Sequence, residues 1–418
     1  MPSKFAGKIW ALGTRVMNVV RQRQDPFDTF QRSVNPSTWK THDAILEWAL
    51  GRAENDVEEP RGLADDPLVA EGWSLKQRCQ AEFKDRHRAL GESLRVLVHV
   101  PDFLVSPGGY SLFSNLVDSL QFLGVPSAPL RWEDSTELAI RKFRPTCLLT
   151  SDHSSYLERI DWAMLRAWKD RSGMLIGLTA SLEAYGNTPL EERLQWANQH
   201  SVDFYYSFRS PEYLKDRQEY ERFRRAGYPI FTLEFGANPA LYYPVGEERD
   251  LDYVFLASSN PDKHERYFRY LPEIFKRYHG FVDGPGWRRI TRYAPARAHK
   301  YLYARAKVGL NLHIRDSIER PTELNERTYI LAACGVPQLV DSAKLLPERF
   351  PAGALFIADG PAEYLELYQY MVSHTDEARE RALIGLREVF ARHTTYHKSN
   401  GFLQQLKSHF CLEQFKRK

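Results

Sequence analysis

The feature that most constrains the fold is an alternation of short β-branched apolar runs with helical segments, which begins at Leu94. The run RVLVHVP has the composition of a buried strand, SPGGYS follows as a turn, and LFSNLVDSLQFLGV carries its apolar residues on one helical face. The alternation of strand and helix continues, and the next strands are TCLLTSD, MLIGLT and VDFYYSF. Strands that alternate with helices predict a parallel sheet covered on both faces. We predict this first domain over residues 93–244.

A second series of strands and helices follows the turn-rich segment 236–244. The runs DYVFLAS, FVDGPGW and PQLVD have the composition of strands, and helical sequence separates them. A second domain is therefore predicted over residues 245–390, and residues 391–418 are predicted to form a helix that returns to the first domain. The predicted fold class is α/β, with two doubly wound, Rossmann-like domains that face a cleft. Ligands of such sheets bind at the carboxyl ends of the strands.

The segment before the first domain, residues 1–92, is predicted to be a helical extension with Trp39, Trp48 and Trp73 as packing anchors. Within it, residues 1–24 carry apolar residues at helical spacing among basic ones. Such a helix can lie on an anionic membrane surface or pack on the body of the protein, and we favour packing. No small-residue cleavage site follows, so we do not predict a signal peptide.

Composition narrows the class of protein. The 418 residues carry a formal charge of +3, which gives no electrostatic reason to expect nucleic acid as a partner. The four cysteines lie far apart and form no C-x-x-C pair, so neither disulfides nor a structural zinc site is expected and a reducing cytoplasm fits. No apolar run of about 18 residues occurs, and no transmembrane helix is predicted.

Candidate catalytic groups lie just after two strands of the first domain. His153 and Asp152, in the segment TSDH, are possible general bases or ligands for a sugar hydroxyl. Asp102, after the first strand, is another candidate base. Each of these residue types is also common as a helix cap or in a turn, and that interpretation stays open.

The turn between the first strand and its helix is a candidate loop for an acceptor or a phosphate. It contains Ser106, Gly108 and Gly109. Glycine lets the backbone approach a ligand, and a helix N-terminus favours anions. A plain tight turn is the alternative. The loop does not match G-x-G-x-x-G, so a dinucleotide cofactor is not predicted.

The second domain offers candidate ligands for a nucleotide diphosphate. Ser258 and Lys263 follow its first strand, where small polar residues and a cation suit a diphosphate, although helix capping is the alternative. Arg315 lies in a polar loop, where it pairs with a leaving diphosphate or with solvent. Glu323 and Glu326 lie near the first turn of the next helix, where a carboxylate binds ribose hydroxyls or interacts with the helix dipole.

A D-x-D pattern at Asp250 and Asp252 is the one arrangement that suggests a metal. It precedes a strand and so lies on the side of the sheet away from the expected cleft. We interpret both residues as solvated acidic groups. No cluster of His, Cys and Asp elsewhere has metal-ligand spacing, and no metal is predicted.

Several segments together resemble one enzyme family. Residues 325–335, NERTYILAACG, resemble the N-x-R-x-[FY]-E-x-x-A-C-G stretch of the CgeB-type (spore maturation protein-like) branch of the group 1 glycosyltransferases, which have the GT-B fold. The segments GPGW, YLYARAKVGLN and HTTYH resemble further family segments in the same order. FGANPALYYP resembles the interdomain linker of the wider GT-B group. The resemblance covers roughly residues 94–400.

The resemblance implies a division of labour between the domains. The donor is expected in the C-terminal domain, where Asn325 and Arg327 belong to the family motif, and the acceptor in the N-terminal domain. It also implies that protein cations and helix dipoles stabilise the leaving diphosphate without a metal. One position departs from the family, because Ile330 stands where a glutamate is expected to bind the ribose. Glu326 lies one helical turn earlier on the same face and is the candidate substitute.

The predicted activity is transfer of a sugar from a nucleotide-diphosphate sugar to an unidentified glycan, protein or small molecule, without a cofactor. His153 or Asp102 would take the acceptor proton if the anomeric configuration inverts. The alternatives are a non-catalytic GT-B scaffold or sugar-binding subunit, which Ile330 suggests, and a nucleotide-sugar epimerase, since fold alone does not determine the reaction.

Overall fold

The structure is a computed structural model, which describes residues 26–56, 59–60, 62–180 and 188–412. The predicted amphipathic segment 1–24 lies outside these residues. Among the described residues, no helix is long and apolar enough to cross a membrane.

The first domain is a parallel sheet of six strands within the described residues, in the order β2-β1-β3-β4-β5-β6. The strands are β1 (Val96–Val100), β2 (Ser127–Arg131), β3 (Cys147–Ser151), β4 (Leu175–Thr179), β5 (Phe204–Ser207) and β6 (Ile230–Thr232). The helices between them are α5 (Pro107–Phe122), α6 (Thr136–Phe143), α7 (Ser154–Leu157), α8 (Trp162–Ser172), α9 (Leu190–Gln199), α10 (Pro211–Asp216) and α11 (Gln218–Arg225).

Both faces of this sheet are buried, which explains the continuous apolar runs of its strands. In β1, Val96, Val98 and Val100 belong to one core cluster, and Leu97 between them belongs to another. The chain order reverses between β1 and β3, because β2 pairs with β1 on one side and β3 pairs with it on the other. This switch point is the place where a doubly wound sheet binds ligands.

The second domain is a parallel sheet of five strands within the described residues, in the order β11-β10-β9-β7-β8. The strands are β7 (Leu251–Leu256), β8 (Gly280–Asp283), β9 (Ala306–Asn311), β10 (Gln338–Asp341) and β11 (Phe356–Ala358). The helices are α12 (Pro261–Tyr270), α13 (Pro272–Arg277), α14 (Ala296–Ala304), α15 (Arg315–Glu319), α16 (Glu326–Ala333), α17 (Leu346–Arg349), α18 (Pro361–Ser373) and α19 (Thr375–Arg392). The switch point of this sheet lies between β7 and β9.

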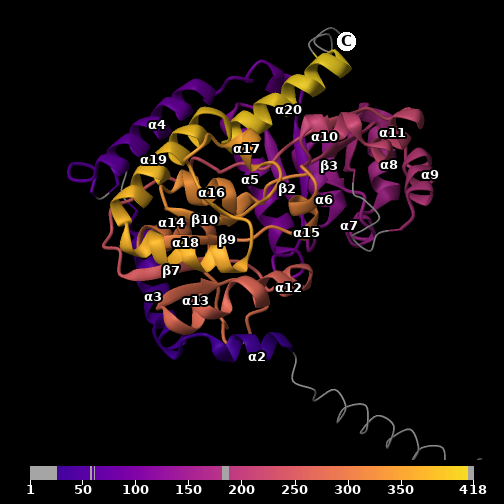
Figure 1. Ribbon diagram of the computed structural model, residues 1–418. Helices are drawn as coiled ribbons and strands as arrows, with labels where there is room; N and C mark the ends of the chain where they lie inside the picture. Colours follow the sequence, from indigo (N-terminus) through magenta and orange to yellow (C-terminus); the bar gives the residue numbers. More distant parts are fainter. Residues whose placement is uncertain (1–25, 57–58, 61, 181–187, 413–418) are drawn as a thin grey trace, which may run out of the picture.

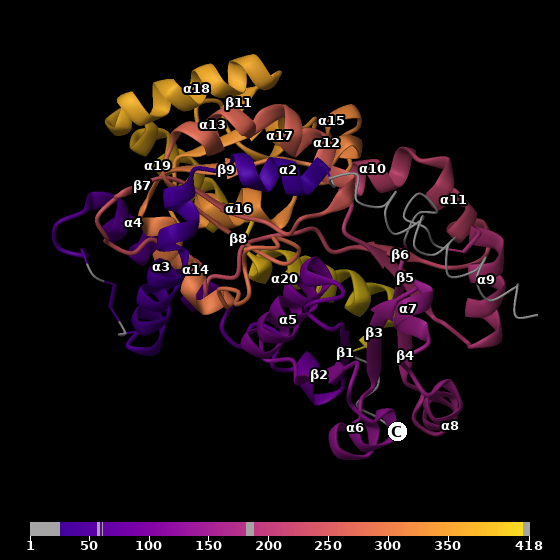
Figure 2. The same cartoon turned by 90° about the horizontal axis from the view of Figure 1, so that it is seen from below.

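The two ends of the chain pack on the domain that is distant in sequence (Figures 1 and 2). The extension forms α2 (Pro26–Ser33), α3 (Pro36–Glu54), α4 (Pro67–Phe83) and the short η1 (Leu90–Glu92). Helix α2 contacts α13, α3 contacts α14 and β8, and α4 contacts α19, so the extension covers the second domain. The last helix, α20 (Thr395–Phe410), packs on α5 and β6 of the first domain.

The chain passes between the two domains at two places, and these two segments lie side by side. Ala237, in the linker, forms an isolated parallel bridge with Thr394, just before α20. The backbone N–H of Ala237 donates to His393 O at 3.1 Å, and that of Thr395 donates to Ala237 O at 2.9 Å. Gly236 allows this approach, since a Cβ there would lie 2.6 Å from His393 O. The linker and the start of α20 are therefore bonded directly to each other.

Candidate functional site

The switch point of the second domain gathers a guanidinium and two strand ends. Arg327, in the first turn of α16, donates from Nε to the carbonyl of Leu256 at the end of β7, at 2.8 Å. Its Nη1 lies 3.3 Å from Oδ1 of Asn311 at the end of β9. Arg327 therefore spans the gap between the two strands where the chain order reverses, the expected position for a ligand of this domain.

Two further residues predicted as donor ligands reach the same strand end. Asn325 caps α16, because its Oδ1 accepts from the backbone N–H of Thr328 at 3.1 Å. Its Nδ2 donates to Leu312 O at 3.1 Å. Lys263, in the first turn of α12, donates from Nζ to the same carbonyl at 3.2 Å. Thus Asn325, Lys263 and Arg327 converge on one place.

The electrostatics of this cluster favour an anion. Burial, together with repulsion from the neighbouring Arg327, lowers the pKa of Lys263 to about 7. Both cations lie in first turns of helices, where the helix dipole also favours negative charge. A bound diphosphate would relieve the repulsion between Lys263 and Arg327.

A glycine turn closes the loop that contains Ser258. Gly284 has φ +134°, and a Cβ there would lie 2.5 Å from Ala257 O, so only glycine fits. Ser259 N donates to Pro285 O at 2.7 Å and binds the turn to the loop. Ser258 is half-buried, and its carbonyl accepts from the Tyr267 hydroxyl at 3.2 Å.

Arg315 does not join this cluster. It lies exposed on α15, where its Nε pairs with Glu319 at 2.9 Å. The acidic pair at the start of β7 is also at the other end of the strand, where Asp250 pairs with Arg305 and Asp252 lies 2.8 Å from the Lys307 ammonium. Among the described residues, no group of three His, Cys, Asp or Glu side chains is placed to hold a metal.

The predicted residues of the first domain surround its own switch point. Asp102 is exposed after β1, and its Oδ1 accepts from the backbone N–H of Leu104 at 2.8 Å, as in an Asx turn. His153 caps α7, because its Nδ1 accepts from the Ser155 N–H at 3.3 Å. Its Nε2 makes no hydrogen bond within the described part of the chain. The His153 ring is half-buried, so this nitrogen remains available to a substrate.

The loop that precedes α5 lies at the same end of the sheet. Ser106 Oγ accepts from the Tyr156 hydroxyl at 3.4 Å, Gly108 is exposed and Gly109 packs against Tyr156. Asp152, in contrast, is 1% exposed and forms an ion pair with Arg193 of α9. Its role as a base is therefore not supported, because the carboxylate is buried and paired with a guanidinium.

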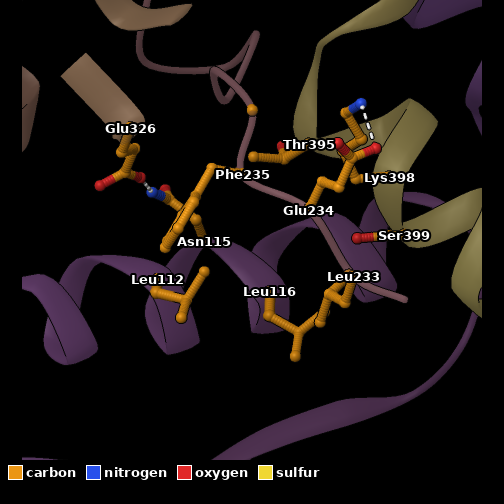
Figure 3. Close-up of a pocket in the computed structure, with 11 residues that line it drawn as sticks. Leu112, Asn115, Leu116, Leu233, Glu234, Phe235, Glu326, Thr395, Lys398 and Ser399 are labelled. Atoms are coloured by element: carbon orange, nitrogen blue, oxygen red, sulfur yellow. Dashed lines mark hydrogen bonds and ion pairs between the residues drawn. The ribbon is translucent and has the colours of Figure 1, made fainter. Parts of the chain in front are cut away.

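Glu326 connects the two domains. Its carboxylate accepts from Asn115 Nδ2 of α5 at 2.8 Å (Figure 3). It also accepts from Ser111 Oγ of the same helix at 2.8 Å. Burial outweighs the opposing effect of these two hydrogen bonds and raises the pKa of Glu326 to about 7. Ile330, one turn later, is 6% exposed and part of the apolar core.

A small cavity lies between Glu326 and the chain crossings that join the domains (Figure 3). Its volume is about 20 Å³, enough for roughly one water molecule. On its far side, Lys398 of α20 donates to Glu234 Oε2 at 3.2 Å, and Arg349 Nη2 lies 3.0 Å from Glu234 Oε1. The domains therefore meet closely here, and the cavity is too small for a sugar.

Sequence reasoning missed several residues of the interface. Arg209, after β5, forms an ion pair with Glu323 of the second domain, and the N–H of Ser210 donates to Thr322 O at 3.3 Å. Ser111 and Asn115 of α5 were missed as well. Arg209 could have been noticed as a cation at the end of a strand, whereas Ser111 looks like an ordinary residue of a helical turn.

Comparisons with known proteins agree with this architecture. Residues 265–404 match a family profile described as Glycosyl transferase-like. A comparison with curated protein sequences finds no match.

Three solved structures similar to the chain were determined with UDP or UDP-glucose. An alpha-glucosyltransferase in complex with UDP and a 13-mer DNA has 14% identity and a TM-score of 0.50, over 76% of this chain and 99% of that one. T4 phage BGT with UDP-glucose has 11% identity and a TM-score of 0.48, over 75% and 99%. Anabaena HepE with UDP-glucose has 11% identity and a TM-score of 0.49, over 75% and 100%.

The fold and the family match define the class of protein. The alpha-glucosyltransferase shares the arrangement of two facing Rossmann-like domains, which is the GT-B fold. The segment that matches the glycosyltransferase profile includes α16, with its Arg327, and most of α12. The chain is therefore a glycosyltransferase of the GT-B type, an enzyme that transfers sugars.

Proposed function

We propose that the protein transfers a sugar from a nucleoside diphosphate sugar, bound at the β7/β9 switch point, to an acceptor hydroxyl at the β1/β3 switch point. The observation that carries the proposal is the convergence of Asn325, Lys263 and Arg327 on the ends of β7 and β9. UDP is the first nucleotide to test, because the alpha-glucosyltransferase of the same fold was solved with UDP.

In this proposal, the protein itself neutralises the leaving diphosphate. Arg327 and Lys263 supply positive charge, and the N-termini of α12 and α16 supply aligned dipoles. Such preorganised groups stabilise charge as it develops on the leaving oxygen. We therefore propose a reaction that requires neither a metal nor another cofactor.

Glu326 is proposed to bind the ribose of the donor in place of the family glutamate. Its carboxylate accepts from two donors of α5, an arrangement that two ribose hydroxyls would reproduce. Ile330 has no polar group for this role. Donor binding would then exchange the contacts to Ser111 and Asn115 for contacts to the ribose, which links the nucleotide to movement of the domains.

The acceptor is proposed to approach His153 from the cleft. In an inverting reaction, His153 Nε2 takes the proton of the acceptor hydroxyl, the acceptor oxygen bonds to the anomeric carbon, and the bond from that carbon to the diphosphate oxygen breaks. Asp102 is the second candidate, although its Oδ1 is already used in a turn. A retaining reaction would not need either base.

The subgroup and the location follow from other observations. We propose the CgeB-type branch because the segments NERTYILAACG and HTTYH resemble it. All four cysteines are free, three of them buried, which supports a reducing cytoplasm. A glycan, a protein or a small molecule could each supply the acceptor hydroxyl. Contact of residues 1–24 with a membrane surface remains a proposal from their sequence alone.

Two arginines give a matched test of the donor site. The assay would measure hydrolysis of UDP-glucose through the UDP that is released, without an acceptor and with EDTA present. We expect Arg327→Leu to lower kcat/KM at least tenfold, because it removes a cation from the switch point. Arg315→Leu, the same change on the exposed surface, should alter kcat/KM less than twofold. Equal losses in the two variants, or activity that disappears with EDTA, would contradict the proposal.

A further inference from the structure

The helical extension packs against two loops of the proposed donor site, the loop after β7 and the turn after β8. Trp287 ends the turn that follows β8 and is 1% exposed. It is covered by aromatic rings of the extension, with centroids 5.1 Å away for Phe27, 6.1 Å for Phe30 and 6.3 Å for Trp39. In Figure 2, α2 lies across the second domain, and it contacts α13 there.

The turn held by the extension is also bonded to the loop after β7. Trp287 Nε1 donates to Ala257 O at 2.7 Å, and Ser259 N donates to Pro285 O at 2.7 Å. A Cβ on Gly286 would lie 2.7 Å from Ser259 Cβ, so the two loops are in close contact. A shift of the turn therefore moves the loop that leads into α12 and Lys263.

A second line of contacts reaches this loop directly from α2. The ring of Phe27 stacks on His264, with centroids 4.3 Å apart and planes 5° from parallel. His264 Nε2 lies 2.8 Å from Ser259 Oγ, within hydrogen-bond distance. Phe27 is 3% exposed and is held in place by the core around it. The Phe27 ring thus fixes the imidazole, and the imidazole orients the Ser259 hydroxyl.

We infer that α2 is part of the donor site and that Phe27 is a positioning residue for the loop 258–263. Through His264 and Trp287, it holds that loop in the shape in which its first helical turn and Lys263 face a nucleotide diphosphate. Preorganisation of this kind raises affinity by removing the cost of ordering the loop when the ligand binds. The inference rests on the proposed function, because it assumes a nucleotide at the β7/β9 switch point.

A purely structural role is the competing explanation, and one matched residue separates the two. Phe83 is another buried phenylalanine of the extension, 1% exposed, and it packs on a histidine, with its centroid 4.6 Å from that of His397. It lies on α4, which packs on α19, whereas Phe27 lies on α2. Replacement of either phenylalanine by leucine keeps an apolar side chain in the core and removes the ring.

The test measures the dissociation constant for UDP by calorimetry and the melting temperature of the same full-length samples. We expect Phe27→Leu to weaken UDP binding at least fivefold, and Phe83→Leu to lower the melting temperature to a similar extent with less than a twofold change in affinity. His264→Ala, at a half-buried position, provides the same test if Phe27→Leu does not fold, and should also weaken binding at least fivefold.

Two results would overturn the inference, and they differ in meaning. Wild-type affinity in both Phe27→Leu and His264→Ala would contradict the role of α2 and leave the proposed donor site standing. Failure of the unaltered protein to bind UDP or any other nucleoside diphosphate would contradict the proposed function, and the role of α2 with it.

Discussion

Lys263 and Arg327 show how the environment of a side chain decides its chemistry. Both are cations near one strand end, and burial brings the pKa of Lys263 to about 7. The ammonium is therefore lost in a pH range where the guanidinium stays charged. We expect the affinity for UDP to fall several-fold between pH 6.5 and 8.5, because fewer molecules carry the Lys263 charge.

Calorimetric titrations at pH 6.5, 7.5 and 8.5 measure this dependence. Lys263→Met should bind more weakly at pH 6.5 and show a flatter profile, since it lacks the titrating group. The phosphate of UDP titrates equally in both proteins and cancels in the comparison. Parallel profiles would mean that Lys263 does not contact the nucleotide.

Glu326 leads to a prediction about stability. Its pKa in the folded protein is about 7, above the ordinary value of 4.5, so the folded state binds more protons than the unfolded state between these values. The contribution of Glu326 is therefore fully present below about pH 4.5 and is lost as the pH rises through 7, by at most about 1.4 kcal/mol per pH unit.

Urea unfolding at pH 5, 6 and 7 tests this assignment. Glu326→Gln has no titrating carboxyl, so its free energy of unfolding should fall less steeply with pH than that of the wild type. The difference between the two proteins should change in favour of the variant as the pH rises. A constant difference across the three pH values would show that burial does not raise the pKa of Glu326.

At the scale of the element, the strand ends were predictable and the contacts between domains were not. Asn325, Lys263 and Arg327 follow apolar runs or belong to a recognisable motif, so their convergence follows from the parallel sheet. The contact of Glu326 with α5 joins segments that lie far apart in the chain, and no local pattern encodes it. The packing of the extension on the second domain was unpredictable for the same reason, because the apolar pattern of a helix does not specify which surface it packs against.

The paired segment between the domains gives a prediction at the same scale. Gly236→Ala would place a Cβ 2.6 Å from His393 O and 2.8 Å from Thr394 C, which forces the two crossings apart. We expect a loss of roughly 1–3 kcal/mol in unfolding free energy. Gly401→Ala is the control, because it lies inside α20 with no atom within 4 Å of its Cβ.

Denaturant unfolding of the two alanine variants decides the question. Gly401→Ala should leave the free energy of unfolding unchanged or raise it by up to about 1 kcal/mol, as expected for alanine in a helix. If Gly236→Ala proves equally harmless, the close approach of the linker and His393 is not required for the fold.

For the whole molecule, the two ends of the chain link the stability of the two domains, because each end packs on the domain that is distant in sequence. The extension covers the second domain, while α20 buries Tyr396, Phe402, Leu403 and Leu406 against the first. We expect one cooperative thermal transition in the full chain, because neither domain keeps its cover when the other unfolds. Removal of residues 395–418 should expose the first domain and produce a separate transition at lower temperature in calorimetry. A truncated protein that still melts in one transition at the original temperature would contradict this linkage.

The location of the nucleotide is the central claim, and a crystal structure of the protein with UDP tests it most directly. We expect diphosphate oxygens within about 3 Å of the Arg327 guanidinium and the Lys263 ammonium, at the carboxyl ends of β7 and β9. A nucleotide bound elsewhere, such as the β1/β3 switch point or the start of β7 beside Asp250, would contradict it.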